Sequence, residues 1–162
     1  PRMIFWLSSH EERTRQAKKR WWHAVAAECT SYRLQPIKVS TKYTDAWEFA
    51  MTYSQISSIE HIQNAIYLYT LSALPEDITK LSGAFGQFFQ YSIATLEEIM
   101  PYMNKKIQTV STFGIHPSKI RQHLLAHRVM GVDRVVPIGQ AMDMSILWDG
   151  MNMIESLSRI LR

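Results

Sequence analysis

The stretch that decides the fold lies near the start of the chain and reads Arg2-Met3-Ile4-Phe5-Trp6-Leu7, followed shortly by Ser9-His10-Glu11-Glu12. The first run is short, apolar and aromatic, which is typical of a buried β-strand. Ser9 and Glu12 have the spacing of a capping box, which marks the beginning of a helix. A strand followed at once by a capped helix is the first half of a βα unit.

This helix is expected over residues 10–29, because small and apolar side chains recur there at helical spacing. Four of them form its expected inner face: Ala17, Trp21, Ala24 and Val25. Trp22 follows Trp21 directly, and neighbouring residues on a helix face different ways. At least one of the two indoles is therefore expected in the core.

Strands and helices are predicted to alternate along the rest of the chain. After a break at residues 35–37, caused by Pro36, a second helix is expected over residues 45–57 with Trp47, Met51 and Ser54 on one side. Further strands are expected at residues 65–71, 88–91, 107–113 and 134–139, and further helices at residues 95–104, 117–130 and 151–161. The last helix has three apolar residues on its expected inner face: Ile154, Leu157 and Ile160.

This alternation, with short connections, predicts an α/β fold in which a parallel sheet has helices on both faces, a three-layer α/β/α architecture. In such sheets ligands bind beyond the carboxyl ends of the strands. The loops that follow Leu7, Phe113 and Ile138 are therefore the first candidates for a binding site.

The composition is that of an ordinary globular protein. The 162 residues suffice for one domain with a real core, and 46% of them are hydrophobic and 20% charged. No apolar run approaches the roughly 20 residues that span a bilayer, and no signal-peptide pattern opens the chain. The single cysteine, Cys29, excludes an intrachain disulfide and favours a reducing, cytoplasmic location.

A basic run contributes much of the net charge of +4. It consists of Arg13, Arg15, Lys18, Lys19 and Arg20. Such a run can attract nucleic acid, but neither a recognised nucleic-acid motif nor a set of stacking aromatics accompanies it. A solvated helix face is the favoured interpretation, and no nucleic-acid partner is expected.

Histidine and cysteine give weak signals for chemistry. His123 and His127 stand one helical turn apart, with His116 nearby, but the sequence offers no adjacent third ligand. We therefore expect helix surface and no metal. Cys29 lies near the end of a helix without an evident group that would activate its thiol, so a structural role is favoured over a nucleophilic one.

Two glycine-containing clusters remain open to a functional interpretation. Gly83 and Gly86 precede a strand, whereas a phosphate loop follows a strand and opens a helix, so a tight turn or a close ligand approach is favoured. Trp148-Asp149-Gly150 lies between the last strand and the last helix. Asp149 could be the N-cap of that helix, could belong to a site, or could be both.

Several segments of the last sixty residues carry a resemblance to a known family. They are Ile107-Gln108-Thr109-Val110-Ser111, Gly131-Val132-Asp133-Arg134-Val135-Val136-Pro137-Ile138-Gly139, Trp148-Asp149-Gly150 and Leu157-Ser158-Arg159. Together they resemble the C-terminal segment of the LuxC-type long-chain acyl-CoA (fatty acid) reductases of the aldehyde dehydrogenase superfamily. Those enzymes make long-chain aldehydes for bacterial luminescence, and relatives occur in non-luminous bacteria.

The resemblance implies that residues 1–162 are the C-terminal part of an aldehyde-dehydrogenase-like catalytic domain. The strand and helix at the start of the chain resemble those that follow the nucleophilic cysteine in that superfamily, so the nucleophile and most of the nucleotide-binding domain would lie upstream of Pro1. The implied reaction is NADPH-dependent reduction of an acyl thioester through a cysteine acyl-enzyme. No catalytic residue is then expected within the chain, and the chain alone is expected to be inactive.

The resemblance also implies which residues face the ligands. Segment 83–87 is similar to the dehydrogenase loop Glu-Ile-Phe-Gly-Pro, so Phe85 and Gly86 are expected to bind the cofactor. Gly83 stands where that loop has its glutamate, which holds the nicotinamide-side ribose, and Gln87 replaces the proline. Trp148, Asp149 and Gly150 are expected on the acyl-substrate side.

Two alternatives stay open beside the reductase. One is an aldehyde dehydrogenase relative that oxidises its substrate, and the other is a noncatalytic docking module for an acyl-transferring protein. For the reductase the substrate would be a long-chain acyl-CoA or an acyl-protein thioester. Self-association into a homo-oligomer is expected by analogy with the superfamily.

Overall fold

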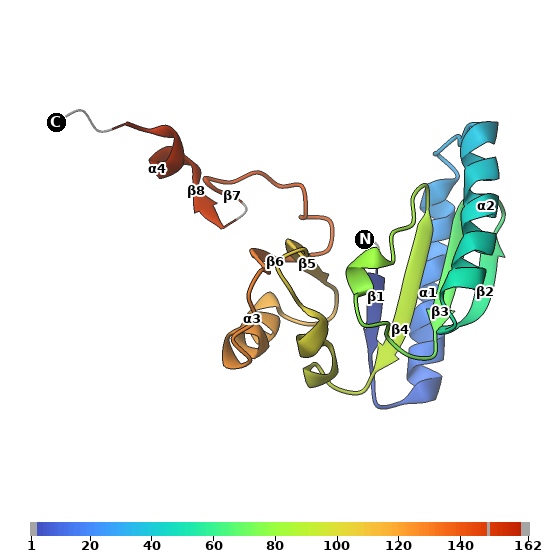
Figure 1. Ribbon diagram of the computed structural model, residues 1–162, viewed down its shortest axis with the longest axis horizontal. Coiled ribbons are helices and arrows are strands. Elements are labelled where there is room, and N and C mark those ends of the chain that lie inside the picture. Colours follow the sequence, from blue (N-terminus) through green and yellow to red (C-terminus); the bar gives the residue numbers. More distant parts are fainter. Residues whose placement is uncertain (1–2, 149, 160–162) are drawn as a thin grey trace. The chain divides into compact units, whose positions relative to one another are not determined.

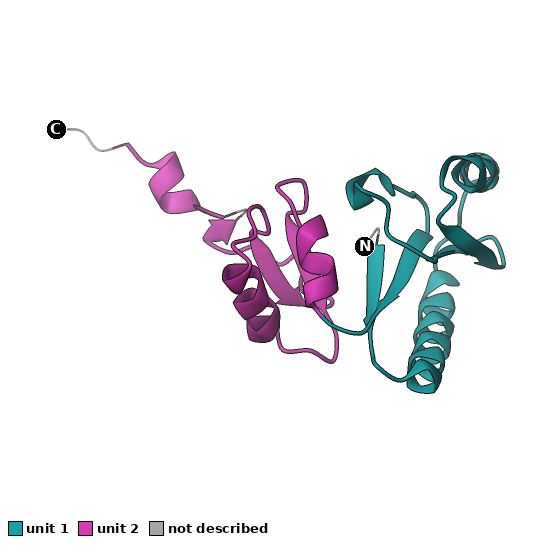
Figure 2. Ribbon diagram, turned by 60° about the horizontal axis from the view of Figure 1, so that its bottom comes forward, with its two compact units in different colours: residues 1–95 teal, residues 96–162 magenta. Residues whose placement is uncertain are grey.

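The computed structural model describes residues 3–148 and 150–159. Its helices and strands are labelled in Figure 1, and the chain divides into two compact units, residues 1–95 and residues 96–162 (Figure 2). Unit 1 contains β1 (Met3–Leu7), α1 (Glu11–Cys29), α2 (Pro36–Thr52), β2 (Ile56–Ile62), β3 (Ile66–Leu71), the 3₁₀ turn η1 (Ile78–Lys80) and β4 (Gln87–Ile93). Unit 2 contains η2 (Glu97–Tyr102), β5 (Thr109–Thr112), α3 (Pro117–Ala126), β6 (Arg134–Pro137), β7 (Leu147–Trp148), β8 (Met151–Asn152) and α4 (Met153–Leu157).

The four strands of unit 1 form one sheet in the order β1-β4-β3-β2. β4 pairs in parallel with both β1 and β3, whereas β2 and β3 form an antiparallel hairpin. The prediction of an α/β fold is therefore confirmed. The prediction of a parallel sheet holds for β1, β4 and β3, whereas β2 is antiparallel. The hairpin is an addition that the sequence analysis did not include.

Helices α1 and α2 cover opposite faces of this sheet. Trp22 of α1 packs against Leu68 and Phe88, whereas Phe49 of α2 packs against Tyr69 and Phe89. Because successive side chains of a strand point to opposite faces, these two contact sets lie on the two sides of β3 and β4. Unit 1 thus has three layers, helix, sheet and helix.

The α1 side of the sheet is organised around a buried amide. Gln90 Oε1 accepts hydrogen bonds from Nε1 of Trp6 at 3.0 Å and from Nε1 of Trp22 at 3.1 Å. Its Nε2 donates to Thr70 Oγ1 at 2.9 Å. A buried polar side chain is stable only with such partners, so Gln90 links α1, β1, β3 and β4 at one point.

Unit 2 is built on a βαβ arrangement. β5 and β6 pair in parallel, with Val110 opposite Val135, and α3 connects them along the chain. Ile120 and Leu124 are the buried residues of α3. Beyond β6 the chain forms the short antiparallel pair β7–β8 and then α4. None of the helices within residues 3–148 and 150–159 combines the length and the apolarity needed to cross a membrane.

The prediction for the second helix was wrong in position. α2 begins at Pro36, which occupies its first turn, where the missing N–H of proline costs nothing. It ends at Thr52, and residues 56–62 form β2 instead of helix. Trp47 and Met51 are 58% and 79% exposed, because the side of α2 that faces the sheet carries other residues, among them Lys42 and Phe49.

Three other helices also differ from expectation, two in where they begin or end and one in which side chains it buries. The N-cap of α1 is His10, whereas Ser9 was the expected N-cap. The backbone N–H of His10 donates a hydrogen bond to the hydroxyl of Ser8. Helix α3 ends at Ala126, and Arg128 takes a left-handed conformation (φ 50°), so the helix does not reach Gly131. In α4 the two described residues of the expected inner face, Ile154 and Leu157, are exposed, and Ile160 lies outside the described residues.

The buried amide of Gln90 gives a test of this core. Replacing Gln90 by leucine removes the acceptor of two indole N–H groups, and each buried polar group left without a partner costs about 1–3 kcal/mol. We expect the free energy of unfolding of Gln90→Leu to fall by about 2–4 kcal/mol in urea titrations followed by fluorescence. The control Gln16→Leu, at an exposed position of α1, should change it by less than about 0.5 kcal/mol. Equal effects of the two substitutions would contradict the role of Gln90.

Candidate functional site

The residues predicted to bind ligands lie in both units. Phe85 and Gly86 belong to unit 1, and Trp148 and Gly150 belong to unit 2. Asp149 lies outside the described residues. The two groups are therefore described separately.

Phe85 and Gly86 lie at the amino edge of the sheet, directly before β4. Because β1 runs parallel to β4, with Met3 opposite Phe89, the beginning of β1 lies at this same edge. The loop after Leu7, which the carboxyl-edge rule indicates, lies at the opposite edge. The rule and the family resemblance thus point to opposite ends of one sheet.

The backbone of Gly86 is packed closely against the turn before β3. Its φ is +87°, and a Cβ added there would lie 2.2 Å from the carbonyl oxygen of Ala65. The carbonyl of Gly86 also accepts a hydrogen bond from the backbone N–H of Tyr67 at 2.9 Å. Glycine is required at this position by the conformation and by the contact.

Phe85, the neighbouring residue, keeps its ring accessible. The side chain is 42% exposed, and the ammonium of Lys38 lies 5.3 Å from the ring centroid. An exposed aromatic face beside a positive charge can pack against a flat, anionic ligand.

Lys42 lies beneath this loop and is completely buried. Its Nζ donates to the backbone carbonyls of Asn64 at 2.7 Å and Ala65 at 2.8 Å, and it lies 4.7 Å from the ring centroid of Tyr67. Burial lowers the pKa of Lys42 to about 8, against an opposing influence of Cys29. No sequence pattern indicates this burial, because residue 42 lies outside the expected helix and lysine is rarely buried.

Gln87, which replaces the proline of the dehydrogenase loop, belongs to a second buried network. Its Nε2 donates to Asp45 Oδ2 at 2.7 Å, and its Oε1 accepts from the hydroxyl of Tyr69. Burial raises the pKa of the Tyr69 hydroxyl, helped by the charge of Asp45. Gln87 therefore has a structural task that proline, without a side-chain amide, could not perform.

In unit 2 the structure brings together two of the segments that carry the family resemblance. The guanidinium carbon of Arg134 lies 4.5 Å from the ring centroid of Trp148, over the indole face. Gly150 has φ +75°, and a Cβ added there would lie 3.2 Å from Asp133 Oδ1. The start of β6 therefore contacts both described residues of the predicted Trp148–Gly150 site. The N-cap of α4 is Asn152, whose side chain accepts from the backbone of Ile154 and Glu155.

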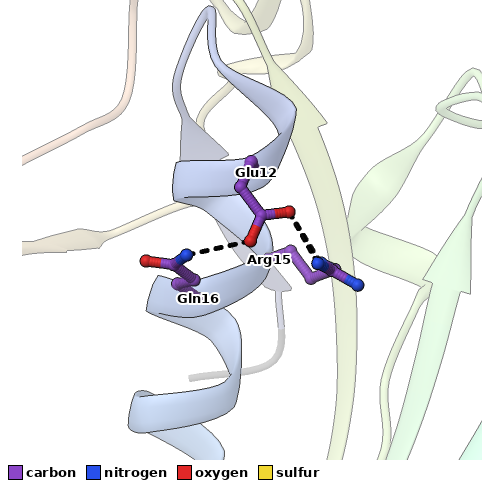
Figure 3. Close-up of polar contacts among 3 residues, drawn as sticks. All are labelled: Glu12, Arg15 and Gln16. Carbon is purple, nitrogen blue, oxygen red and sulfur yellow. Dashed lines mark hydrogen bonds and ion pairs between the residues drawn. The ribbon is translucent and has the colours of Figure 1, made fainter.

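The carboxyl end of β1 borders a groove of about 330 Å³. Its lining includes Trp6, Leu7, Ser8, Arg13, Thr14 and Arg20. Other basic side chains of α1 have partners within the protein: Arg15 pairs with Glu12, which also accepts from Gln16 (Figure 3), and Lys18 donates to Ser92 Oγ. The hydrogen bond from Gln16 and the pairing with Arg15 lower the pKa of Glu12. The exposed Arg15–Glu12 pair supports the interpretation of the basic run as a solvated face.

The histidines of α3 make local contacts. His123 Nδ1 lies 3.1 Å from Glu97 Oε1, and His127 Nδ1 lies 3.0 Å from the carbonyl oxygen of His123. His116 caps the helix through Nδ1, which accepts from the backbone of Ser118. Within residues 3–148 and 150–159, no group of three or more histidine, cysteine or acidic side chains could hold a metal ion. Cys29 is half-buried against the Trp22 cluster.

Comparison with known proteins gives no relative, since no protein-family model matches the sequence and no curated protein matches it.

The buried ammonium of Lys42 predicts a specific pH dependence of stability. Its folded-state pKa of about 8 lies below the ordinary value of 10.5, so between these pH values the unfolded chain binds more protons than the folded one. The contribution of Lys42 to the free energy of unfolding therefore rises with pH in this range, by at most about 1.4 kcal/mol per pH unit, and is constant below pH 8.

Urea unfolding of the wild type and of Lys42→Met between pH 7 and pH 10 measures this contribution, with Lys19→Met on the exposed side of α1 as the control. The difference between wild type and Lys42→Met should grow above pH 8 in favour of the wild type. The difference for the control should stay flat. A difference for Lys42→Met that does not vary with pH would refute the prediction.

Proposed function

We propose that this chain is the C-terminal portion of an NADPH-dependent acyl-thioester reductase of the LuxC type, which produces a long-chain aldehyde. The observation that carries the proposal is the parallel register of β1 with β4. A cysteine directly upstream of β1 would lie at the amino edge of the sheet, beside the loop that contains Phe85 and Gly86. The proposal requires the nucleophile and the cofactor loop to share an edge in this way.

The residues of this loop fit a nicotinamide nucleotide as a packing surface. Phe85 offers an accessible ring, Lys38 adds a positive charge beside it, and Gly86 fixes the turn that carries Phe85 by packing against Ala65. When bound, the nucleotide would supply the hydride. No carboxylate for the ribose is present at position 83, which is glycine, and this departure favours a reductase over an oxidising aldehyde dehydrogenase relative.

In unit 2 the surroundings of Trp148 suit a fatty acyl chain. Leu147 and Met151 flank the β7–β8 turn and expose apolar side chains to solvent. Methionine and aromatic side chains are common where a surface receives a flexible apolar ligand. In the proposed reaction the cysteine thiolate attacks the thioester carbonyl and becomes acylated, and the thiol leaves.

The proposal predicts that activity depends on the upstream segment. The 162-residue chain alone should not oxidise NADPH in the presence of a long-chain acyl-CoA, whereas the protein extended upstream to include the cysteine should do so and release aldehyde. In that longer protein Trp148→Ala should lower kcat/KM for long acyl chains by about tenfold or more, since a lost aromatic contact costs about 1.5–3 kcal/mol. Tyr32→Ala, at an exposed aromatic residue after α1, is the control.

Two results would overturn the proposal. The absence of a cysteine within several residues upstream of Pro1 would remove the nucleophile, and turnover by the chain alone would assign the chemistry to Cys29. Aldehyde is quantified by gas chromatography, so NADPH oxidation without product does not count as activity.

The competing proposal is a noncatalytic interaction module, and the outer side of α2 favours it. Helical spacing groups three apolar residues there, each more than half exposed: Tyr43, Trp47 and Met51. Tyr43 and Trp47 contact each other edge to face, with ring centroids 6.2 Å apart. Contiguous apolar surface of this kind commonly marks a protein contact, for which a second copy of this chain is the simplest occupant.

Sedimentation velocity of the chain tests self-association through α2, which the interaction module requires. If α2 mediates self-association, Trp47→Lys should weaken the dimer by about thirtyfold or more, as expected for an aromatic hot spot. Thr41→Lys, an exposed position outside the apolar side of α2, should leave the dimer intact. A wild-type chain that stays monomeric at all concentrations would dismiss self-association through α2.

A further inference from the structure

The side chain of Arg134 contacts the segment that leads to Trp148 at several points. Its Nη1 donates to the carbonyl oxygen of Ala141 at 2.9 Å. Its Nη2 donates to the carbonyl oxygens of Asp143 at 2.9 Å and Gln140 at 3.5 Å. The same guanidinium lies over the indole of Trp148. One side chain thus holds both the β6–β7 connection and the aromatic residue that follows it.

The β6–β7 connection buries few apolar side chains that could stabilise it. Met142 and Met144 are more than four-fifths exposed, so the segment gains little from apolar packing. Its local backbone bonds, from Gln140 to Pro137 and from Asp143 to Gln140, close short turns but do not reach Trp148. Hydrogen bonds to a charged donor are stronger than neutral ones, and the guanidinium presents five donors in a fixed plane. Arg134 therefore supplies the main fixed point for this segment.

The neighbouring Asp133 extends this arrangement to the far side of the turn. Its carboxylate lies where a Cβ on Gly150 would make a tight contact, while the pairing of Trp148 with Met151 closes the β7–β8 hairpin. Arg134 thus contacts Trp148, and Asp133, directly before it, lies close to Gly150.

We propose that Arg134 is the positioning residue of Trp148, which it holds through the cation–π contact and the three carbonyl hydrogen bonds, and that it thereby determines the preference for long acyl chains. The second part rests on the proposed reductase function, whereas the first part does not. A lysine could keep the charge but could not bind three carbonyls and cover an indole with one planar group.

Fluorine NMR of the chain labelled with fluorotryptophan tests the positioning directly. The chain has five tryptophans, and Trp148→Phe identifies the resonance of the one in unit 2. In Arg134→Lys this resonance should shift and become more sensitive to a soluble paramagnetic quencher, while the four resonances of unit 1 stay in place. The control Arg121→Lys, an exposed arginine of α3, should leave all five unchanged. An unaltered Trp148 resonance in Arg134→Lys would overturn the proposal.

A second variant keeps the test decisive if Arg134→Lys unfolds unit 2. Trp148→Leu leaves Arg134 intact and removes only the ring. The Nε–Hε resonance of Arg134 in nitrogen-labelled protein should then move, because the ring current above the guanidinium is lost. Trp47→Leu should not move it. An Arg134 resonance that is indifferent to Trp148→Leu would also overturn the proposal.

Kinetics of the upstream-extended protein separates this proposal from the proposed function. Arg134→Lys should raise KM for long-chain acyl-CoA by roughly threefold to thirtyfold, the range that corresponds to a lost cation–π contact, with kcat and the KM for short chains unchanged. A moved Trp148 resonance in a protein without reductase activity supports the positioning role and refutes the reductase. An active reductase whose KM does not respond to Arg134→Lys refutes the specificity role.

Discussion

The parallel pairing of β1 with β4 is the constraint on which the rest of unit 1 depends. It joins strands from the two ends of residues 1–95 and leaves β4 between β1 and β3, with a helix on each face. Every side chain of β4 that points into these layers loses water and must pack or find a hydrogen-bond partner. This requirement explains why the two glutamines of β4, Gln87 and Gln90, are the centres of the two buried networks.

These networks fix the register of the sheet more sharply than apolar packing alone. Gln90 accepts hydrogen bonds from the two indoles on the α1 side. Gln87 hydrogen-bonds with Asp45 and Tyr69 on the α2 side. A shift of β4 by one residue would turn each amide to the other face and leave the indole N–H groups without an acceptor. Apolar residues such as Phe89 tolerate small displacements, whereas a buried donor does not.

The sequence predicts the strands β1, β3, β4 and β6 because each is a short apolar run, and a local pattern suffices to identify it. It does not predict the bounds of α2, because a proline such as Pro36 fits a break between elements as well as the first turn of a helix, and because Lys42 occupies a buried position. It does not predict β7 and β8 either, because Asp149-Gly150 fits both a hairpin turn and a loop before a helix. The contact of Arg134 with Trp148 depends on a turn of the backbone between them, which no periodicity encodes.

The position of Phe85 and Gly86 bears on the kind of chemistry that the sheet could support. The carboxyl-edge rule describes ligands held by loops that follow strands and by helix N-termini. A nucleophile directly before a strand lies at the other edge, because the chain enters the strand from the amino edge of the sheet. In unit 1 that edge carries the Gly86 turn, the accessible ring of Phe85 and the buried ammonium of Lys42. The carboxyl edge carries an open groove bordered by arginines. A covalent mechanism therefore favours the amino edge, while an anion held without covalent attachment would favour the other.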